Sequence, residues 1–395
     1  MAPSLRPRAD RRRVEDMLVR FVDIPSVNPA LDDGTGEAAL ANAVFAELKQ
    51  AGFSPSRHRA APAGRDNISV LLEGEPESPL LMWEAHIDTV VPSGKAQTRA
   101  VLDGGRVYGR GSCDTKGSLV AMIEGLLLLA TGPRPRARVL FTTSIDEEVG
   151  GQGAVAIVAD HPDIDMAVVG EPTDLEVAIA HKGVLRLQIT TLGVPAHSSK
   201  PHLGVNAIHR MSKVLDALEH DYIPTLAAAD HPLVGPPTIS VSTIKGGTAE
   251  NIVPASCTIV IDRRLNPGED PDQVVAAIDL ALEPLQRQGI ELLRSPPAFI
   301  MAPLHTSPDH PLVGAMQRAR AQVLGEPGQP IGVTYGTDAS CFATAGIPCV
   351  VFGPGNIDHA HSDEEWVEVE DTALAAEILA ASARDPGVSR PLEPT

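Results

Sequence analysis

The stretch "PLLMWEAHIDTV", residues 79–90, begins as an almost continuous apolar run and ends in His86 and Asp88. Such a run predicts a strand that is buried on both faces, as in a parallel sheet covered by helices. The polar ending predicts a functional site, because ligands of open α/β sheets bind at the carboxyl ends of the strands. This one segment therefore suggests both a fold and the edge of the sheet where the chemistry takes place.

Two later segments repeat the pattern. Residues 137–148, "ARVLFTTSIDEE", end in Glu147 and Glu148, and residues 165–173, "DMAVVGEPT", contain Glu171 directly after the apolar run. Segments with helical spacing separate the strands, at residues 116–132 and 153–162. The alternation predicts an α/β fold with a mostly parallel sheet covered by helices, and with these carboxylates at one edge.

The middle of the chain has a different pattern. Residues 182–295 show a strand-helix-strand-strand-helix-strand order with alternating rather than continuous apolar positions. This order predicts an inserted, compact domain of the ferredoxin-like α+β type. Because helices and strands alternate again afterwards, we expect a catalytic domain in two parts, 1–181 and 296–395.

Composition narrows the classes of partner. With 395 residues and 43% hydrophobic content, the chain fits a globular protein of two domains. A formal net charge of -19 argues against nucleic acid or an anionic membrane as partner. The four cysteines form no CxxC pair, which suits a reducing compartment, and no apolar run approaches the ~18 residues of a membrane span. We therefore expect a cytoplasmic protein, either an enzyme or a binding protein, whose partner is neither nucleic acid nor a membrane.

The polar strand endings suggest a metal site. His86 and Asp88 are two residues apart, so in an extended chain they face the same side, as a metal-binding imidazole and its supporting carboxylate do. Glu147 and Glu148 are adjacent and point opposite ways, so one can bind a metal while the other faces a water. Asp114 lies in a glycine-rich turn, "GRGSCDTKG", where a helix N-cap is the more frequent role for a lone aspartate.

Glu171 and His361 complete the candidate ligand set, with His359 as the alternative to His361. Two histidines and several carboxylates without a thiolate favour a pair of Zn²⁺ ions, with Co²⁺ or Mn²⁺ as substitutes. Two such ions lie ~3.5 to 4 Å apart and share a bridging carboxylate and a water. The joint occurrence of these residues, rather than any single motif, predicts the site.

Several motifs together resemble a known family. They are "HIDTVVP", "GRGSCDTKG", "DEEVGGQGA", "GEPTDLEVAIAHKG", "GVPAHSSKPHLGVNAI", "GGTAENIVPASCTIVIDRRLNPGED", "YGTDASCFATAGIP" and "GPGNIDHAHSDEEW". They are similar, in the same order, to the di-zinc family of acetylornithine deacetylase, succinyl-diaminopimelate desuccinylase, aminoacylase and glutamate carboxypeptidase. The resemblance extends over nearly the whole chain and implies hydrolysis of an amide bond by a zinc-activated water. It also implies a di-zinc exopeptidase-like fold in which the inserted domain serves as a lid or a dimerisation unit.

The resemblance also implies roles for individual residues. One zinc would be held by His86, Asp114 and Glu171, and the other by Asp114, Glu148 and His361. Asp114 would bridge the ions, and its bond to Thr115 resembles the family's cis peptide. Glu147 matches the general base, and Asp88 matches the residue that supports His86.

Further roles fall in and beside the inserted domain. His197 resembles a histidine that reaches the active site of the partner subunit, which implies a homodimer formed through the inserted domain. Asn251 and Arg264 resemble substrate-binding residues, and Gly336 and Thr337 resemble the loop that receives a substrate carboxylate. An arginine suits this task because its planar fork binds a carboxylate bidentately.

Three functions remain open on the sequence. The first is an N-acyl-amino-acid deacylase of the acetylornithine deacetylase or succinyl-diaminopimelate desuccinylase type, which belongs to amino-acid metabolism. The second is a dipeptidase or carboxypeptidase that uses the same di-zinc site. The third is a catalytically silent binding protein, which the complete set of ligands and base makes the least favoured. Ser340 and Cys341 lie outside any G-x-S-x-G elbow, so a serine or cysteine nucleophile is a poor alternative.

Overall fold

The computed structural model describes residues 8–31, 34–93 and 98–388. Contacts within the chain divide it into two compact units. The first consists of Met1–Ile179, Thr306–Ile331 and Thr337–Thr395, and the second consists of Ala180–His305 with Gly332–Gly336. The second unit continues past residue 295, the predicted end of the insertion, because strand β13 (Phe299–Met301) still pairs with strand β9 (Gly183–Leu192).

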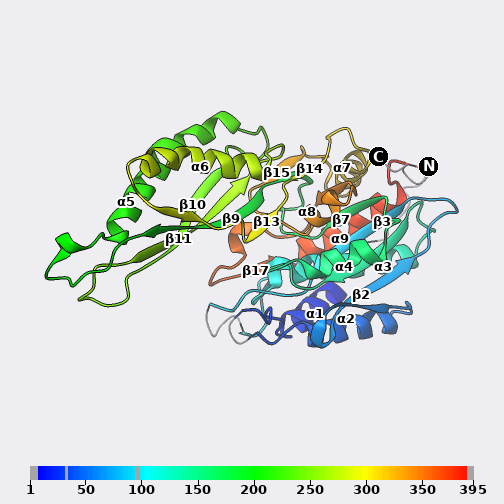
Figure 1. Cartoon of the computed structure of the whole chain (residues 1–395). Coiled ribbons are helices and arrows are strands. Elements are labelled where there is room, and N and C mark those ends of the chain that lie inside the picture. The colour runs from blue at the N-terminus through cyan, green and yellow to red at the C-terminus, as the bar shows by residue number, and fades with distance from the viewer. Residues whose placement is uncertain (1–7, 32–33, 94–97, 389–395) are drawn as a thin grey trace. The chain divides into compact units, whose positions relative to one another are not determined.

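The first unit contains a mixed sheet with the order β1-β2-β6-β3-β7-β16, and β16 pairs in turn with the start of β8. Figure 1 labels three of its strands, β2, β3 and β7. The strands are β1 (Ser56–Ala61), β2 (Arg65–Leu72), β3 (Leu80–His86), β6 (Arg138–Ser144), β7 (Met166–Val169), β8 (Ala178–His181) and β16 (Cys349–Val351). The last two residues of β8 belong to the second unit and pair there with β14 (Leu304–His305), and β15 (Ile331–Val333) also pairs with β8. Strands β6, β3, β7 and β16 are parallel, whereas the outer pairings are antiparallel. The predicted α/β class is confirmed, with a sheet that is parallel only at its centre.

Strand β3 is buried along its whole length, in agreement with its continuous apolar sequence. The chain passes from β3 through α3 to its neighbour β6, and then back through α4 to β7 on the other side of β3. Right-handed crossovers in opposite directions place the two helices on opposite faces of a sheet. The parallel centre is therefore covered on both sides, and its carboxyl ends form the edge where the functional residues lie.

The helices of the first unit are α1 (Arg11–Val22), α2 (Ala38–Gln50), α3 (Gly117–Ala130), α4 (Gln152–Asp160), α7 (Pro311–Leu324), α8 (Ala339–Thr344) and α9 (Val369–Arg384). Helix α3 is apolar on nearly all sides and packs against α9, α1 and the strands β3 and β6. Helix α1 begins at Asp10, whose carboxylate accepts hydrogen bonds from the backbone N–H groups of Arg12 and Arg13. Such a cap satisfies donors that the first helical turn leaves free.

A separate antiparallel sheet has the order β17-β5-β4, from β4 (Val101–Asp103), β5 (Arg106–Tyr108) and β17 (Trp366–Glu368). Short helical segments complete the first unit: η1 (Pro62–Gly64), η3 (Ser112–Lys116) and η7 (Ile357–His359). The strands of this small sheet bracket η3, which carries Asp114, in the sequence. This small sheet was not predicted from the sequence.

The second unit has the predicted order of elements: β9, α5 (Ala207–Ala217), β10 (Thr238–Gly246), β11 (Ser256–Leu265), α6 (Pro271–Arg287) and β12 (Leu292–Arg294), with the short helices η4 (Pro201–Leu203), η5 (Leu218–Tyr222) and η6 (Ile223–Ala229). The strands form an antiparallel sheet in the order β10-β11-β9-β12. This is the split βαβ arrangement expected of a ferredoxin-like domain. Strand β10 is an edge strand and is exposed along most of its length.

The core of the second unit is a cluster of apolar side chains. They come from β9 and β11 and from the facing sides of α5 and α6, with Leu187, Ile259 and Ile278 among the fully buried members. In the described ranges of the chain, no helix combines the length and the apolar character needed to cross a membrane.

Candidate metal centre

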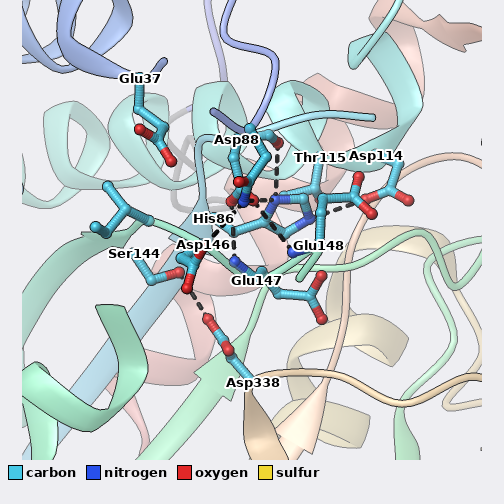
Figure 2. A network of polar contacts seen from close by, with 12 residues as sticks. Glu37, His86, Asp88, Asp114, Thr115, Ser144, Asp146, Glu147, Glu148 and Asp338 are labelled. Carbon is cyan, nitrogen blue, oxygen red and sulfur yellow. Dashed lines mark hydrogen bonds and ion pairs between the residues drawn. The ribbon is translucent and has the colours of Figure 1, made fainter. Parts of the chain in front are cut away.

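The residues at the strand ends meet at one edge of the central sheet. His86 is the last residue of β3, Glu147 and Glu148 follow β6, and Glu171 follows β7. Because β6, β3 and β7 are parallel neighbours, their carboxyl ends lie side by side. Figure 2 shows the carboxylates of Asp88, Asp114, Glu147 and Glu148 gathered around the His86 ring.

Asp114 lies between two groups of possible ligands. Its Oδ1 is 2.9 Å from Nε2 of His86, and its Oδ2 is 3.2 Å from Nε2 of His361. The peptide bond between Asp114 and Thr115 is cis, as the family resemblance implied. One carboxylate thus presents a separate oxygen to each of two histidines, which is the arrangement a bridging ligand requires.

Each histidine has further carboxylates nearby. His86 Nε2 is 3.7 Å from Glu171 Oε1, and His361 Nε2 is 3.3 Å from Glu148 Oε1. Ligand atoms of Asp114, Glu148 and His361 lie within 4.8 Å of one another, and so do those of His86, Glu147 and Glu171. Distance alone would therefore admit Glu147 as a ligand beside His86, in addition to Asp114.

The alternative histidine, His359, is engaged elsewhere. Its ring packs on the ring of Trp366, with centroids 4.3 Å apart and an interplanar angle of 38°. His361, in contrast, has a positive φ of 57° and faces Asp114 and Glu148. The structure thus brings His361, and not His359, to the cluster.

The donor set fits a pair of divalent cations. Asp114, Glu171 and His86 are buried, Glu148 is partly buried and His361 is exposed. Carboxylates in such proximity repel one another unless a cation lies between them. Burial and neighbouring carboxylates raise the pKa of Glu171 well above its ordinary value. Hydrogen bonds to Asp114 and Glu148 raise the pKa of His361 to about 10. Both shifts reflect a concentration of negative charge that divalent cations would neutralise.

Asp88 supports His86 from the opposite side of the ring. Its Oδ1 lies 3.6 Å from Nδ1 of His86, and the same nitrogen is 3.1 Å from the backbone oxygen of Asp88. Burial opposes ionisation of this carboxyl, but hydrogen bonds with His86, Asn28 and the Glu148 backbone keep its pKa below the ordinary value. The imidazole therefore presents Nε2 to Asp114, as a metal ligand should.

Glu147 combines a position beside the ligands with a raised pKa. Burial raises the pKa of its carboxyl well above the ordinary value, and the nearby charges of Glu171, Asp338 and Glu148 add to this effect. A carboxylate with an elevated pKa accepts a proton more readily, which suits a general base. Glu147 therefore has properties that suit proton transfer, although the raised pKa alone does not distinguish it from Glu171.

The candidate residues of the second unit lie on its loops and on β11. His197 is exposed, and its Nδ1 is 2.7 Å from the Ser199 hydroxyl. Asn251 lies on the neighbouring segment, because its carbonyl accepts a hydrogen bond of 3.0 Å from the Ser198 N–H. Arg264, on β11, donates to Asp262 at 2.8 Å.

Gly336 and Thr337 precede helix α8. Thr337 is fully buried, and its hydroxyl accepts a hydrogen bond of 3.2 Å from the N–H of Ala339, the first residue of α8. Gly336 has no room for a side chain, since a Cβ there would lie 2.4 Å from the sulfur of Met301.

Three contributions to the centre were not predicted. Asn28, before α2, donates to the Asp88 carboxylate, and Glu365 accepts hydrogen bonds from the N–H groups of Cys113 and Asp114. Beneath the site, the Ser144 hydroxyl is 2.7 Å from Asp338 (Figure 2). Glu365 lies in the acidic run "SDEEW", directly after the candidate ligand His361, and this acidic run was a signal for further polar contacts at the site. Asn28 lies in an irregular segment without any periodic pattern, so no comparable signal exists there.

Together, the fold and the site define a metal-dependent hydrolase. Residues 82–385 match the description Peptidase family M20/M25/M40, and the chain belongs to this family. It is a hydrolase of amide or peptide C–N bonds, and the family recognised from the sequence motifs is confirmed.

Individual relatives agree with this assignment. The chain is 33% identical over 350 residues to acetylornithine deacetylase from Myxococcus xanthus, covering 85% of this chain and 88% of the relative. A tripeptidase from Staphylococcus aureus has the same fold, with a TM-score of 0.80, 21% identity, and coverage of 96% of this chain and 100% of that one. So does a dinuclear metal-binding M20 peptidase from Bacillus subtilis, with a TM-score of 0.71, 15% identity, and coverage of 95% and 97%.

Proposed function

We propose that this protein hydrolyses the amide bond of an N-acyl amino acid with the help of two divalent cations, Zn²⁺ in the first place and Co²⁺ or Mn²⁺ as substitutes. The observation that carries the proposal is the position of Asp114, whose two oxygens face His86 and His361 at 2.9 and 3.2 Å. In this assignment His86, Asp114 and Glu171 hold one ion, and Asp114, Glu148 and His361 hold the other. The dinuclear peptidase of the same fold supports two ions rather than one.

The side chains then have separate tasks in the reaction. Bound cations would lower the pKa of a water towards ~7 and polarise the substrate carbonyl. Glu147 accepts the proton of the attacking water and delivers it to the departing amine, for which its buried position and raised pKa are suited. Asp88 holds His86 in the tautomer that leaves Nε2 free for the metal.

The similarity to acetylornithine deacetylase supports an acyl-amino-acid substrate. Arg264, with Asn251, Gly336 and Thr337, is the proposed binding set for the amino-acid part, because a guanidinium can bind a carboxylate with two parallel hydrogen bonds. The alternative is a dipeptidase or carboxypeptidase, which the tripeptidase of the same fold keeps open. A panel of N-acetyl and N-succinyl amino acids and dipeptides, scored by amine release, separates the two.

The decisive test uses the variant Glu147→Gln, which keeps the size of the side chain and removes its basicity. We expect it to retain two metal equivalents by elemental analysis while turnover falls roughly 100- to 10,000-fold. Full activity in this variant would contradict the assignment of the base. A purified wild-type protein that neither binds metal nor cleaves any of the panel would overturn the proposed function and favour a silent binding protein.

We also propose a homodimer through the second unit, with His197 acting in the partner's active site. The exposed edge strand β10, with Val241 37% and Ile244 54% exposed, offers a surface for such pairing. Mixing Glu147→Gln with His197→Ala tests the proposal, because a mixed dimer would regain one complete site only if His197 acts in trans. Absence of regained activity, with a dimer seen by sedimentation, would contradict it. A cytoplasmic location remains our expectation from the free cysteines.

A further inference from the structure

Asn28 is a fully buried asparagine whose carboxamide lies between two carboxylates. Its Nδ2 donates hydrogen bonds of 2.7 Å to Asp88 Oδ2 and 3.0 Å to Asp146 Oδ1. Its Oδ1 accepts one of 3.0 Å from the N–H of Ala30. An amide nitrogen has two hydrogens, so each carboxylate receives one of them. The orientation of the carboxamide is therefore fully determined by its three partners.

The carboxylate that Asn28 holds also fixes the backbone beside it. Asp88 Oδ1 accepts a hydrogen bond of 3.0 Å from the N–H of Glu147, and Oδ2 accepts one of 3.1 Å from the N–H of Glu148. The same carboxylate lies 3.6 Å from His86 Nδ1. A rotation of the Asp88 side chain would consequently displace a proposed ligand on each side of the centre and the proposed base together.

The other neighbour of Asn28 is itself firmly held. Asp146 receives hydrogen bonds from Arg65 at 3.2 Å and from Gln152 at 2.8 Å, and Arg65 is paired with the buried Glu37. Its backbone has a positive φ of 72°, and its carbonyl accepts hydrogen bonds from the N–H groups of Gly150 and Gly151. Asn28 thus links Asp88 to a turn whose geometry is fixed independently of any metal (Figure 2 shows Asp88 and Asp146).

We infer that Asn28 is a positioning residue of the metal centre: it holds the Asp88 carboxylate in the one orientation that serves His86, Glu147 and Glu148 together. The inference rests on the proposed function, since it assigns metal binding to His86 and Glu148. It also explains why two buried carboxylates, Asp88 and Asp146, lie on either side of one amide. Without that donor the two carboxylates would lose the group that separates them and would repel each other as like charges.

The test compares the metal affinity of Asn28→Ala with that of the wild type, by competition of the metal-free proteins with a chromophoric chelator for Zn²⁺. Loss of a residue that supports a ligand typically weakens affinity 10- to 100-fold, and we expect a weakening of roughly this size. We expect kcat to fall by a similar factor while KM changes little, because Asn28 is fully buried and exposes no surface to a substrate. Asn28→Asp, with a third carboxylate in the cluster, should weaken binding more than Asn28→Ala.

Asn67→Ala is the matched control. Asn67 is equally buried and bonds the backbone of Ile145 and Gly153 at either end of the same turn, but it does not contact Asp88. If Asn28 has only a packing role, both alanine variants will lower Tm and keep wild-type metal affinity, and the inference is then overturned. The positioning role instead requires a loss of affinity specific to Asn28→Ala.

Two further measurements keep the outcome clear. If Asn28→Ala does not fold, Asp146→Asn takes its place, because this change weakens one of the two hydrogen-bond acceptors around Asn28. We expect a several-fold loss of metal affinity in this variant. An unchanged affinity would overturn the inference. A wild-type protein that binds no metal would contradict the proposed function itself. If the wild type binds metal and the Asn28 variants have the same metal affinity, only the positioning role is contradicted.

Discussion

The two units of this chain bury different kinds of groups. In the first unit, a set of carboxylates is buried around the strand ends: Glu84, Asp88, Asp114, Asp146, Glu171 and Asp338. In the second unit, the buried cluster is apolar, and the buried Arg263 is paired with Glu269 at 2.5 Å. Burying charge is costly even where it has partners, so the cluster of carboxylates gives the first unit a larger free-energy cost than the second unit has. The difference indicates that the buried groups of the first unit serve catalysis at a cost in stability. The second unit is stabilised mainly by the burial of apolar side chains.

The largest effect should follow from breaking the bridge in the first unit. In Asp114→Asn, one of the two oxygens that face His86 and His361 becomes an NH₂ group, which cannot bind a cation. We expect the variant to lose at least one metal equivalent, and kcat to fall by more than the roughly 100-fold typical of a lost supporting residue. Elemental analysis and steady-state kinetics measure both quantities.

The control for this variant is Asp10→Asn, which keeps a capping oxygen at the start of α1 and is far from the chemistry. It should leave metal content and kcat unchanged. Two metal equivalents with full turnover in Asp114→Asn would contradict the bridging role.

The stability of the second unit should instead depend on its buried apolar side chains. Ile259 is fully buried on β11, and Ile259→Ala should lower the free energy of unfolding by about 2 to 5 kcal/mol, as is usual for cavity-forming changes. Leu280→Ala, at a position 68% exposed on α6, should stay within about 0.5 kcal/mol. Urea unfolding measures both. Loss of metal by Ile259→Ala before unfolding would show that the units are not independent.

The sequence was sufficient for the centre of the fold. The apolar runs of β3, β6 and β7 predict buried parallel strands by themselves, and the spacing of α5 and α6 around alternating strands predicts the second unit. The antiparallel edges of the large sheet, such as β2 against β6, were not predicted. An edge pairing depends on which distant strand a segment meets, and periodicity carries no information about that choice.

The same distinction holds for the site. The candidate ligands that follow apolar strands could be proposed from the sequence, because ligands of α/β sheets bind at the carboxyl ends of the strands. His361 was in the candidate set too, but the sequence left His359 as its alternative. Asn28 and Glu365 could not be assigned from the sequence, since their roles depend on contacts with residues 60 and more than 250 positions away, respectively. Local patterns therefore predict ligands better than the groups that orient them.

Removal of the metals should destabilise the first unit and leave the second unchanged, and we expect this effect to be smaller than those above. A ligand present at about 100 times its Kd stabilises the folded form by about 2.7 kcal/mol, and a chelator removes this contribution. We expect faster hydrogen exchange of the β3 amides after chelation, while the β11 amides keep their protection. In Asp114→Asn, the chelator should increase the hydrogen exchange of the β3 amides less than it does in the wild type. Equal losses of protection in both strands would refute a stabilisation confined to the first unit.

The smallest expected effect concerns a buried histidine at the start of the second unit. His181 is buried in β8, donates from Nδ1 to the Lys182 carbonyl at 3.0 Å, and has no partner for Nε2 within the described residues. Burial lowers its pKa to about 4. The unfolded chain binds a proton below about pH 6.5 and the folded chain does so only below about 4, so stability is full above 6.5 and falls as the pH drops.

From these two pKa values, this residue should cost about 2 kcal/mol of stability between roughly pH 7.5 and pH 5. His181→Gln, which cannot gain a proton, should therefore lose less stability than the wild type over this interval, although its stability at the higher pH can be lower. His305→Gln, at an exposed position of the same unit, controls for the loss of one imidazole. Urea midpoints of metal-free proteins at the two pH values give the comparison, and an equal acid loss in wild type and His181→Gln would show that this ring does not remain neutral in the folded unit.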